Sequence, residues 1–257
     1  MVRRVFTQVW HVVVLVLSML YWAVGGLLFV LVGLVLVPFL PLERSRALGQ
    51  ALLQGAFRLF LLLLRGCGVF QCEWAGFEAL QGVTGGLIIA PNHPALWDAV
   101  FVISKVRGLR CILKASLMHN PFLRGGARLA GFIPNRPAHK MLQHSIEALR
   151  QGDRLLFFPE GTRTRKQENA VNSFQGGLGI IATQSSAPVW PVFIETNSDY
   201  LCKGWPLWRL PDKKVRLRIT LGQPLASPPD ESAAEFTQRL RQAYLDALGK
   251  TPGGEEG

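Results

Sequence analysis

The stretch LIIAPNHPALWD, from Leu87 to Asp98, carries the pattern that decides the expected fold. It opens with a short apolar run of strand length and ends with a histidine and a carboxylate five positions apart, His93 and Asp98. Apolar runs of this length recur along the chain after about residue 69, and stretches with helical character separate them. This alternation predicts an α/β domain.

The expected strands are Leu87 to Ala90, Arg110 to Leu113, Gly131 to Pro134, Leu155 to Phe158, Val189 to Glu195 and Val215 to Leu221. The expected helices are Ala95 to Ser104, Lys140 to Gln151, Gln175 to Ser185 and Asp230 to Leu248, the last with Asp230 as a candidate N-cap after two prolines.

Polar side chains follow four of these strands within one to three residues. They are His93, Lys114, Arg136 and the group Glu160 to Arg163. Because ligands bind at the carboxyl ends of strands in an open α/β sheet, we expect these groups to meet at one edge. Pro94 fits the first position of a helix, so Asp98 would lie one turn further along and fold back to the imidazole.

The chain begins with a long uncharged segment. No Lys, Arg, Asp or Glu occurs from Val5 to Leu42, and Val12 to Val37 is almost wholly apolar. As a helix at about 1.5 Å per residue it would exceed a hydrocarbon core of about 30 Å. A cleaved signal peptide is the alternative, but the core of a signal peptide runs only about 7 to 15 residues. Pro38 and Pro41 are expected to end the helix, and the Gly25-Gly26 pair could let it bend and return.

A second helix is expected from Arg44 to Arg65. Its polar residues fall in one narrow arc at 100° per residue: Arg46, Gln50, Gln54, Arg58 and Arg65. This pattern predicts a basic amphipathic helix lying in a lipid headgroup layer, and the alternative is a helix that faces the core. We therefore expect a two-helix membrane anchor over residues 1–66, an enzyme-like domain over 67–250 and a disordered tail over 251–257.

Composition favours a membrane partner. The chain has 257 residues, a net charge of +11 and 49% hydrophobic residues, with a mean hydropathy of +0.23. The charge would suit either nucleic acid or an anionic membrane. No zinc-finger spacing or RNA-binding aromatic block appears, so only bulk charge supports nucleic acid. The four cysteines lack metal-ligand spacing and are expected to be free thiols, and no metal site is expected.

Taken without any relative, a histidine and an aspartate at this spacing are more often structural than catalytic. They can nevertheless serve acyl transfer from a thioester, which needs a base for the hydroxyl proton, donors for the oxyanion and positioning. Histidine suits the role of base because its unperturbed pKa is about 6.5. A neighbouring carboxylate can select the tautomer and stabilise the imidazolium, as in hydrolase triads.

Four blocks in this order resemble the motifs of the glycerolipid acyltransferases, the family of 1-acylglycerol-3-phosphate and lysophospholipid acyltransferases. NHPALWD resembles the His-x-x-x-x-Asp motif, and FPEGTRTR from Phe158 resembles the acceptor motif. GFIPNR, ending at Arg136, resembles the second motif and VWPVFIE, around Pro191, the fourth. The resemblance covers roughly residues 75 to 225, and it implies a central mixed sheet flanked by helices.

The resemblance implies that His93 and Asp98 are catalytic. It implies substrate binding by Arg136, Glu160, Gly161, Thr162, Arg163 and Lys114. The two arginines suit an acceptor phosphate, because a guanidinium donates two parallel hydrogen bonds to phosphate oxygens. Gly161 would let backbone approach the ligand, and Glu160 could orient an arginine or bind the glycerol hydroxyl.

The implied reaction moves an acyl chain from acyl-CoA or acyl-carrier protein to a lysolipid, with 1-acylglycerol 3-phosphate as the leading acceptor and no cofactor. Another lysolipid acceptor and a non-catalytic membrane-binding protein of the same fold are the alternatives. The expected location is the cytoplasmic face of the inner membrane of a bacterium, because both thioester donors are cytosolic. The aromatic segment Thr196 to Trp208 could shape a substrate pocket or rest on the membrane.

Overall fold

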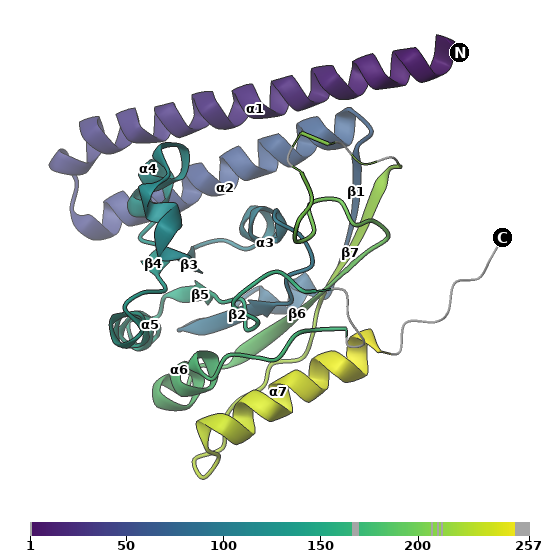
Figure 1. The fold of residues 1–257 in the computed structure, drawn as a ribbon. Helices are drawn as coiled ribbons and strands as arrows, with labels where there is room; N and C mark the ends of the chain where they lie inside the picture. Colours follow the sequence, from purple (N-terminus) through teal and green to yellow (C-terminus); the bar gives the residue numbers. More distant parts are fainter. Residues whose placement is uncertain (1, 166–169, 207, 210, 212, 250–257) are drawn as a thin grey trace.

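The computed structural model describes residues 2–165, 170–206, 208–209, 211 and 213–249 (Figure 1). Within them, seven strands form one sheet in the order β1-β7-β6-β2-β5-β3-β4. Only the β6–β7 pair among its neighbours is antiparallel, so the predicted mixed sheet is confirmed. The strands are β1 Phe70–Ala75, β2 Leu87–Pro91, β3 Leu109–Leu113, β4 Ile133–Pro134, β5 Arg154–Leu156, β6 Val189–Thr196 and β7 Val215–Leu221.

Helices cover both faces of the sheet (Figure 1). α2 Leu42–Gly66 and α3 Asp98–Lys105 lie on one face, and α5 Ala138–Arg150, α6 Gly177–Ser185 and α7 Ala233–Leu248 lie on the other. The longest helix, α1 Val2–Leu36, is outermost and runs along α2. The remaining elements are α4 Pro121–Leu129 and the 3₁₀ turns η1 Val37–Phe39, η2 Phe77–Leu80 and η3 Ala115–His119.

The central strand β2 is buried along its whole length. Leu87 and Ile89 point into the core shared with α2 and α3, whereas Ile88 and Ala90 point into the core shared with α5, α6 and α7. This alternation follows from the two-residue period of a strand. It explains why β2 has an unbroken apolar sequence, as expected of a parallel strand covered on both faces.

All six predicted strands are present, with ends that differ by a few residues. Two elements were not predicted, namely the edge strand β1 and the helix α4. Two helix starts were predicted wrongly. α3 begins at Asp98, so Pro94 is not its first residue. α7 begins after Ser232 because a capping box satisfies its first turn, in which the Ser232 hydroxyl accepts from Glu235 N–H and the Glu235 carboxylate accepts from Ser232 N–H.

The predicted bend at the Gly25-Gly26 pair is absent, because α1 is one continuous helix. Gly26 instead permits close packing on α4. A Cβ at this position would lie 2.6 Å from the Phe122 carbonyl oxygen, and one at Gly125 would lie 2.9 Å from the Val30 side chain. Glycines at such contacts let two helix backbones approach closely.

The polar stripe of α2 faces the domain and not the headgroups, so the prediction of its direction was wrong. The hydrogen bonds of the stripe run from Arg46 to Asp153, from Gln50 to the Ala130 carbonyl, and from Gln54 and Arg58 to the Ser104 carbonyl. Burial beside the sheet leaves these backbone carbonyls without water, and the long polar side chains satisfy them. The opposite, leucine-rich side of α2 is therefore the side exposed together with α1.

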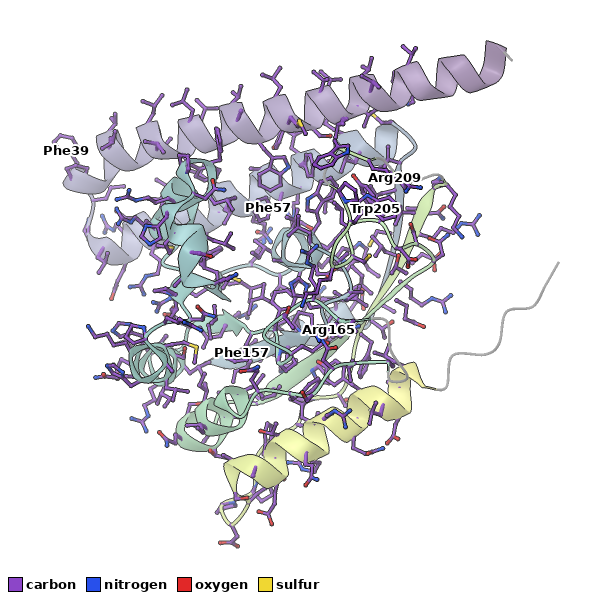
Figure 2. The ribbon with its side chains drawn as sticks, in the orientation of Figure 1. Phe39, Phe57, Phe157, Arg165, Trp205 and Arg209 are labelled. Atoms are coloured by element: carbon purple, nitrogen blue, oxygen red, sulfur yellow. The ribbon has the colours of Figure 1, made fainter. Side chains whose placement is uncertain are left out.

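This arrangement leaves a large apolar surface on the outer layer. Two stretches in the described part of the chain are long and apolar enough to cross a membrane by length and composition alone, Val12–Val35 and Leu42–Gly66. Phe39, at the turn between the two helices, is 84% exposed and projects from the end of the pair (Figure 2). All four cysteines, which lie within the described residues, are free thiols as expected. The predicted disordered tail lies outside the described residues.

Candidate active site

His93 and Asp98 meet in a short loop between β2 and α3. The imidazole Nδ1 lies 2.8 Å from Asp98 Oδ2, and the same oxygen accepts a hydrogen bond of 2.7 Å from Ala95 N–H. The loop therefore folds back on the first residue of α3. The predicted contact forms although the predicted helical register of the loop was wrong.

Asn92 fixes the end of β2 next to this loop. Its side-chain amide donates to the Ile194 carbonyl at 3.0 Å and accepts from Ile194 N–H at 2.7 Å. The side chain thus imitates a backbone pairing with β6 and holds the strand end directly before His93. The sequence analysis assigned no role to Asn92, and only its place between strand and histidine could have suggested one.

Asp98 is fully buried, and its Oδ1 has no hydrogen-bond partner within the described residues. Burial raises the pKa of this carboxyl above its ordinary value, while the hydrogen bonds from His93 and Ala95 oppose that rise. A carboxylate in such a place interacts strongly with a cation beside it, because little water screens the pair. The His93 side chain keeps 18% exposure, and its ring lies 4.2 Å from the Phe158 ring, centroid to centroid.

Glu160 braces the loop that carries His93. Its side chain is 1% exposed, and Oε1 accepts from His93 N–H at 2.9 Å and from the Thr164 hydroxyl at 2.7 Å. Oε2 accepts from Asn172 N–H at 2.9 Å. These donors occupy both carboxylate oxygens, so the geometry favours a positioning role over the expected contacts with an arginine or with the glycerol hydroxyl.

Asn172 was not predicted as a site residue, yet it ties the acceptor-motif loop together. Its amide donates to the Arg163 carbonyl at 3.3 Å and accepts from Arg165 N–H at 3.1 Å. Arg241 of α7 in turn donates to the Asn172 carbonyl at 3.3 Å. No sequence signal marks Asn172, because its partners only become neighbours through the fold.

The Arg163 side chain binds protein carbonyls. Its Nη1 donates to Leu201 O at 3.0 Å and to Cys202 O at 2.8 Å. Leu96 N–H, from the loop that carries His93, also donates to Leu201 O at 3.0 Å. Arg163 therefore joins the acceptor-motif loop to the aromatic segment, and only the rest of its guanidinium stays available for a ligand.

Gly161 and Thr162 lie exposed at the tip of the same turn. Gly161 has φ of +64°, a conformation that glycine adopts without steric cost. A Cβ there would also approach the Gln175 side chain to 3.1 Å. The turn geometry requires glycine, which suffices to explain this position without a ligand.

Lys114 and Arg136 follow the neighbouring strands β3 and β4. Asn135 joins the two strand ends, since its N–H donates to Leu113 O and its side chain accepts from Ala115 N–H. Both side chains are exposed, and neither side chain has a hydrogen bond or ion pair with another described residue. Because neighbouring strands lie about 4.8 Å apart, Lys114 extends from a strand end about 10 Å from β2, and Arg136 extends from one about 14 Å from β2.

An apolar cavity of about 650 Å³ opens beside the loop that carries His93, which is the candidate catalytic loop. Its wall includes Leu96 and Trp97 from that loop, Tyr200 and Leu201 from the aromatic segment, and Trp22 and Phe57 from α1 and α2. The aromatic segment therefore shapes a pocket, and Trp205 packs against Tyr200 behind it at 5.8 Å between ring centroids (Figure 2). The contribution of α1 was not predicted, because an uncharged helix shows no preferred face.

Comparison with known proteins supports the same fold. A family model described as Acyltransferase matches residues 75–195. The structure of the 1-acyl-sn-glycerophosphate (LPA) acyltransferase PlsC from Thermotoga maritima superposes with a TM-score of 0.64 at 20% identity, over 93% of this chain and 98% of that one.

Two curated relatives are 1-acyl-sn-glycerol-3-phosphate acyltransferases. The protein from Chlamydomonas reinhardtii is 25% identical over 67% of this chain and 52% of its own length. The protein from Pseudomonas aeruginosa is 24% identical over 64% of this chain and 65% of its own length. The chain thus spans between about half and two thirds of the length of these two relatives.

The seven-stranded sheet with a His-x-x-x-x-Asp loop after β2 defines an acyltransferase-type α/β domain. Within that class, the chain is similar to the 1-acyl-sn-glycerol-3-phosphate acyltransferases, and the matches support the glycerolipid acyltransferase family. The predicted fold is confirmed, and these matches support the predicted family.

Proposed function

We propose that this protein transfers a fatty acyl chain from a thioester to the free hydroxyl of a lysolipid, with 1-acylglycerol 3-phosphate as the acceptor and phosphatidic acid as the product. The observation that carries the proposal is the His93–Asp98 pair, whose loop also supplies Leu96 and Trp97 to an apolar cavity. A base on a loop that also lines a cavity suited to hydrocarbon is the combination that acyl transfer to a lipid needs.

The geometry supports a single displacement through His93. Asp98 accepts from Nδ1–H and leaves Nε2 with a lone pair, which takes the proton from the acceptor hydroxyl as its oxygen attacks the thioester carbon. The tetrahedral oxyanion then collapses, the carbon–sulfur bond breaks, and the thiolate takes the proton back from the imidazolium. An ester and a free thiol result. The acceptor oxygen is the nucleophile, so no covalent enzyme intermediate and no cofactor are required.

Lys114 and Arg136 are the cations best placed for the acceptor phosphate. Both are exposed at the sheet edge and pair with no other described residue, whereas Arg163 already donates to two carbonyls. Guanidinium and ammonium groups donate charge-assisted hydrogen bonds to phosphate oxygens. The names of the relatives support a phosphate-bearing acceptor.

The outer layer supports association with one leaflet of a membrane. Many large apolar side chains of α1 and α2 are exposed, including Leu20, Leu27, Leu31, Leu34, Leu59 and Leu62. Their removal from water is favourable by about 25 cal/mol per Å² of apolar surface. The polar side of α2 is bound to the domain, so the pair would lie along the membrane with the catalytic domain at its cytoplasmic face. Acyl-CoA or acyl-carrier protein would then reach His93 from the cytosol.

Replacing His93 with alanine tests the proposal. Transfer from palmitoyl-CoA to 1-acylglycerol 3-phosphate, followed by thiol release, should fall by about 10²- to 10⁴-fold, with membrane binding and the melting temperature Tm unchanged. His144, an exposed histidine on α5, provides the matched control through His144→Ala. Near wild-type turnover in His93→Ala would refute the assignment. A panel of other lysolipids shows whether the acceptor phosphate is required.

A further inference from the structure

A second apolar cavity, of about 780 Å³, lies between α1 and α2. Its walls carry the exposed leucines Leu17, Leu28, Leu52, Leu59 and Leu63, so the cavity opens on the outer apolar surface. It spans positions 14 to 32 of α1, about 27 Å at about 1.5 Å per residue. One leaflet of a hydrocarbon core is only about 15 Å deep. The space is therefore long enough for a lipid chain lying along the helices.

The cavity is built into the fold and does not result from loose packing. Trp10 Nε1 donates to the Cys67 carbonyl at 3.2 Å and ties one end of α1 to α2. Tyr21 donates to the Ala56 carbonyl at 2.7 Å near the middle. At the other end α4 holds α1 through the Gly26 contact. These ties fix the spacing of the two helices along the cavity.

The walls are suited to hydrocarbon and not to water. Ser18 and Tyr21 carry the hydroxyl groups of the lining, and both hydroxyls already donate to backbone carbonyls, Ser18 to Val14 O at 2.7 Å. A buried water needs about two to four polar partners. Such a cavity is therefore filled favourably by an acyl chain and poorly by water.

This cavity adjoins the catalytic cavity. Ser18 and Leu64 line both. Phe60, in the wall of the second cavity, packs on Trp22 at 5.2 Å and on Trp97 at 5.0 Å between ring centroids, and these two rings line the catalytic cavity. A single layer of side chains thus separates the two spaces.

We propose that the cavity between α1 and α2 holds the acyl chain of the acceptor lysolipid, while the catalytic cavity holds the chain being transferred. This inference rests on the proposed function, which requires two substrates with long chains to meet at His93. The acceptor comes from the bilayer, and this cavity opens on the surface that would face it. The donor thioester comes from water, and its chain would enter the cavity lined by the catalytic loop.

Two glycines allow the cavity to be filled without a clash. Gly25 and Gly55 line it, and a Cβ added at either meets no atom within 4 Å. Gly25→Leu and Gly55→Leu would therefore place a side chain in the cavity and keep the helices intact. Gly33→Leu is the matched control, because Gly33 also has open space on α1 but lines neither cavity.

Kinetics should separate the acceptor from the donor. With the full chain in phosphatidylethanolamine–phosphatidylglycerol vesicles, each cavity variant should raise the KM for palmitoyl-glycerol 3-phosphate about tenfold, the effect of losing about two buried methylenes. The KM for palmitoyl-CoA, the kcat and the KM for a hexanoyl acceptor should stay unchanged. Unchanged palmitoyl-acceptor KM in both variants would overturn the inference, and so would a rise confined to the donor KM.

Photolabelling tests the site independently of turnover. A lysophosphatidic acid with a diazirine at the chain end should label peptides within 14–32 and 52–67, and Gly55→Leu should abolish this labelling while Gly33→Leu retains it. Equal labelling by a diacyl phospholipid probe would mean that bulk lipid occupies the cavity, which overturns the inference. Loss of transfer in the wild type with the labelling retained would instead count against the proposed function and leave the lipid site standing.

Discussion

The carboxylate of Asp98 has two effects on His93, because it selects the tautomer and places a negative charge beside the imidazolium. Asp98→Asn separates these effects, and the expected loss of activity follows from the contacts of Oδ2. That oxygen accepts from both His93 Nδ1 and Ala95 N–H. Ala95 N–H requires an acceptor, so the carbonyl oxygen of the substituted amide side chain should occupy the same place and still accept from Nδ1–H. The tautomer is then kept, and the loss reduces to the missing negative charge beside the imidazolium.

That charge is worth about three orders of magnitude in rate. Two unit charges about 4 Å apart interact by about 4 kcal/mol at an effective dielectric constant of about 20, which corresponds to about 10³-fold in kcat. A change of tautomer as well would bring the loss to about 10⁴-fold or more. Asp98→Ala, which removes both accepted bonds, should lose at least as much activity and also destabilise the fold.

The same substitution to asparagine should change how the stability of the protein depends on pH. Burial raises the pKa of Asp98 above its unfolded value of about 3.9. The stabilising contribution of this carboxyl is complete below the unfolded pKa and is lost as the pH rises through the folded pKa. Asparagine does not titrate, so the Tm of Asp98→Asn relative to wild type should increase between about pH 4.5 and about pH 7.5.

Two measurements test the electrostatic role of Asp98 and the effect of burial on its titration. Thiol release under saturating substrates gives kcat, and tryptophan fluorescence during heating gives Tm at both pH values. A kcat within tenfold of wild type would refute the electrostatic role of Asp98. A Tm difference that shrinks with rising pH would refute the claim that burial dominates its titration.

Substitutions at Arg136, Lys114 and Asn172 test the loops around the dyad. Arg136→Ala, and Lys114→Ala beside it, should each raise the acceptor KM about tenfold, because each removes a charge-assisted bond to phosphate. Separate titration of the two substrates would show the error if only the donor KM rises. Asn172→Ala should lower kcat about tenfold at unchanged acceptor KM, since it frees the Arg163 and Arg165 backbone. Rescue by Asn172→Asp, which keeps the acceptor for Arg165 N–H, is expected to be partial, and full activity of Asn172→Ala would exclude the positioning role.

The sequence was sufficient to predict where the chemical groups lie along the sheet edge. The apolar runs are bounded by glycine, proline and polar residues, so the strand ends could be located to within a few residues. His93 and Asp98 are close in sequence, and a short loop brings them together whatever its exact form. The edge strand β1 was not predicted, because FQCEWA alternates buried and exposed positions and contains no apolar run. The helix α4 was not predicted, because it contains two adjacent glycines, which have a low helix propensity.

The role of Glu160 could not be predicted, because it depends on contacts between distant parts of the chain. Its partners His93 and Asn172 lie 67 and 12 residues away. A motif shows that a carboxylate is present but not whether it faces substrate or backbone. Here burial decides, because the Glu160 side chain is 1% exposed and both carboxylate oxygens already accept from protein donors.

The partner of the polar face of α2 could not be predicted from the sequence either. Its arc of Arg46, Gln50, Gln54 and Arg58 establishes that the helix has two faces, but not what each face meets. A headgroup layer and a row of buried carbonyls are both partners for long polar side chains. In this protein the partners are buried carbonyls of the domain, those of Ser104 and Ala130. Since the polar face is used in this way, the apolar face is the one that would meet lipid under the proposed function, and the catalytic domain would then join the membrane surface without a flexible linker between them.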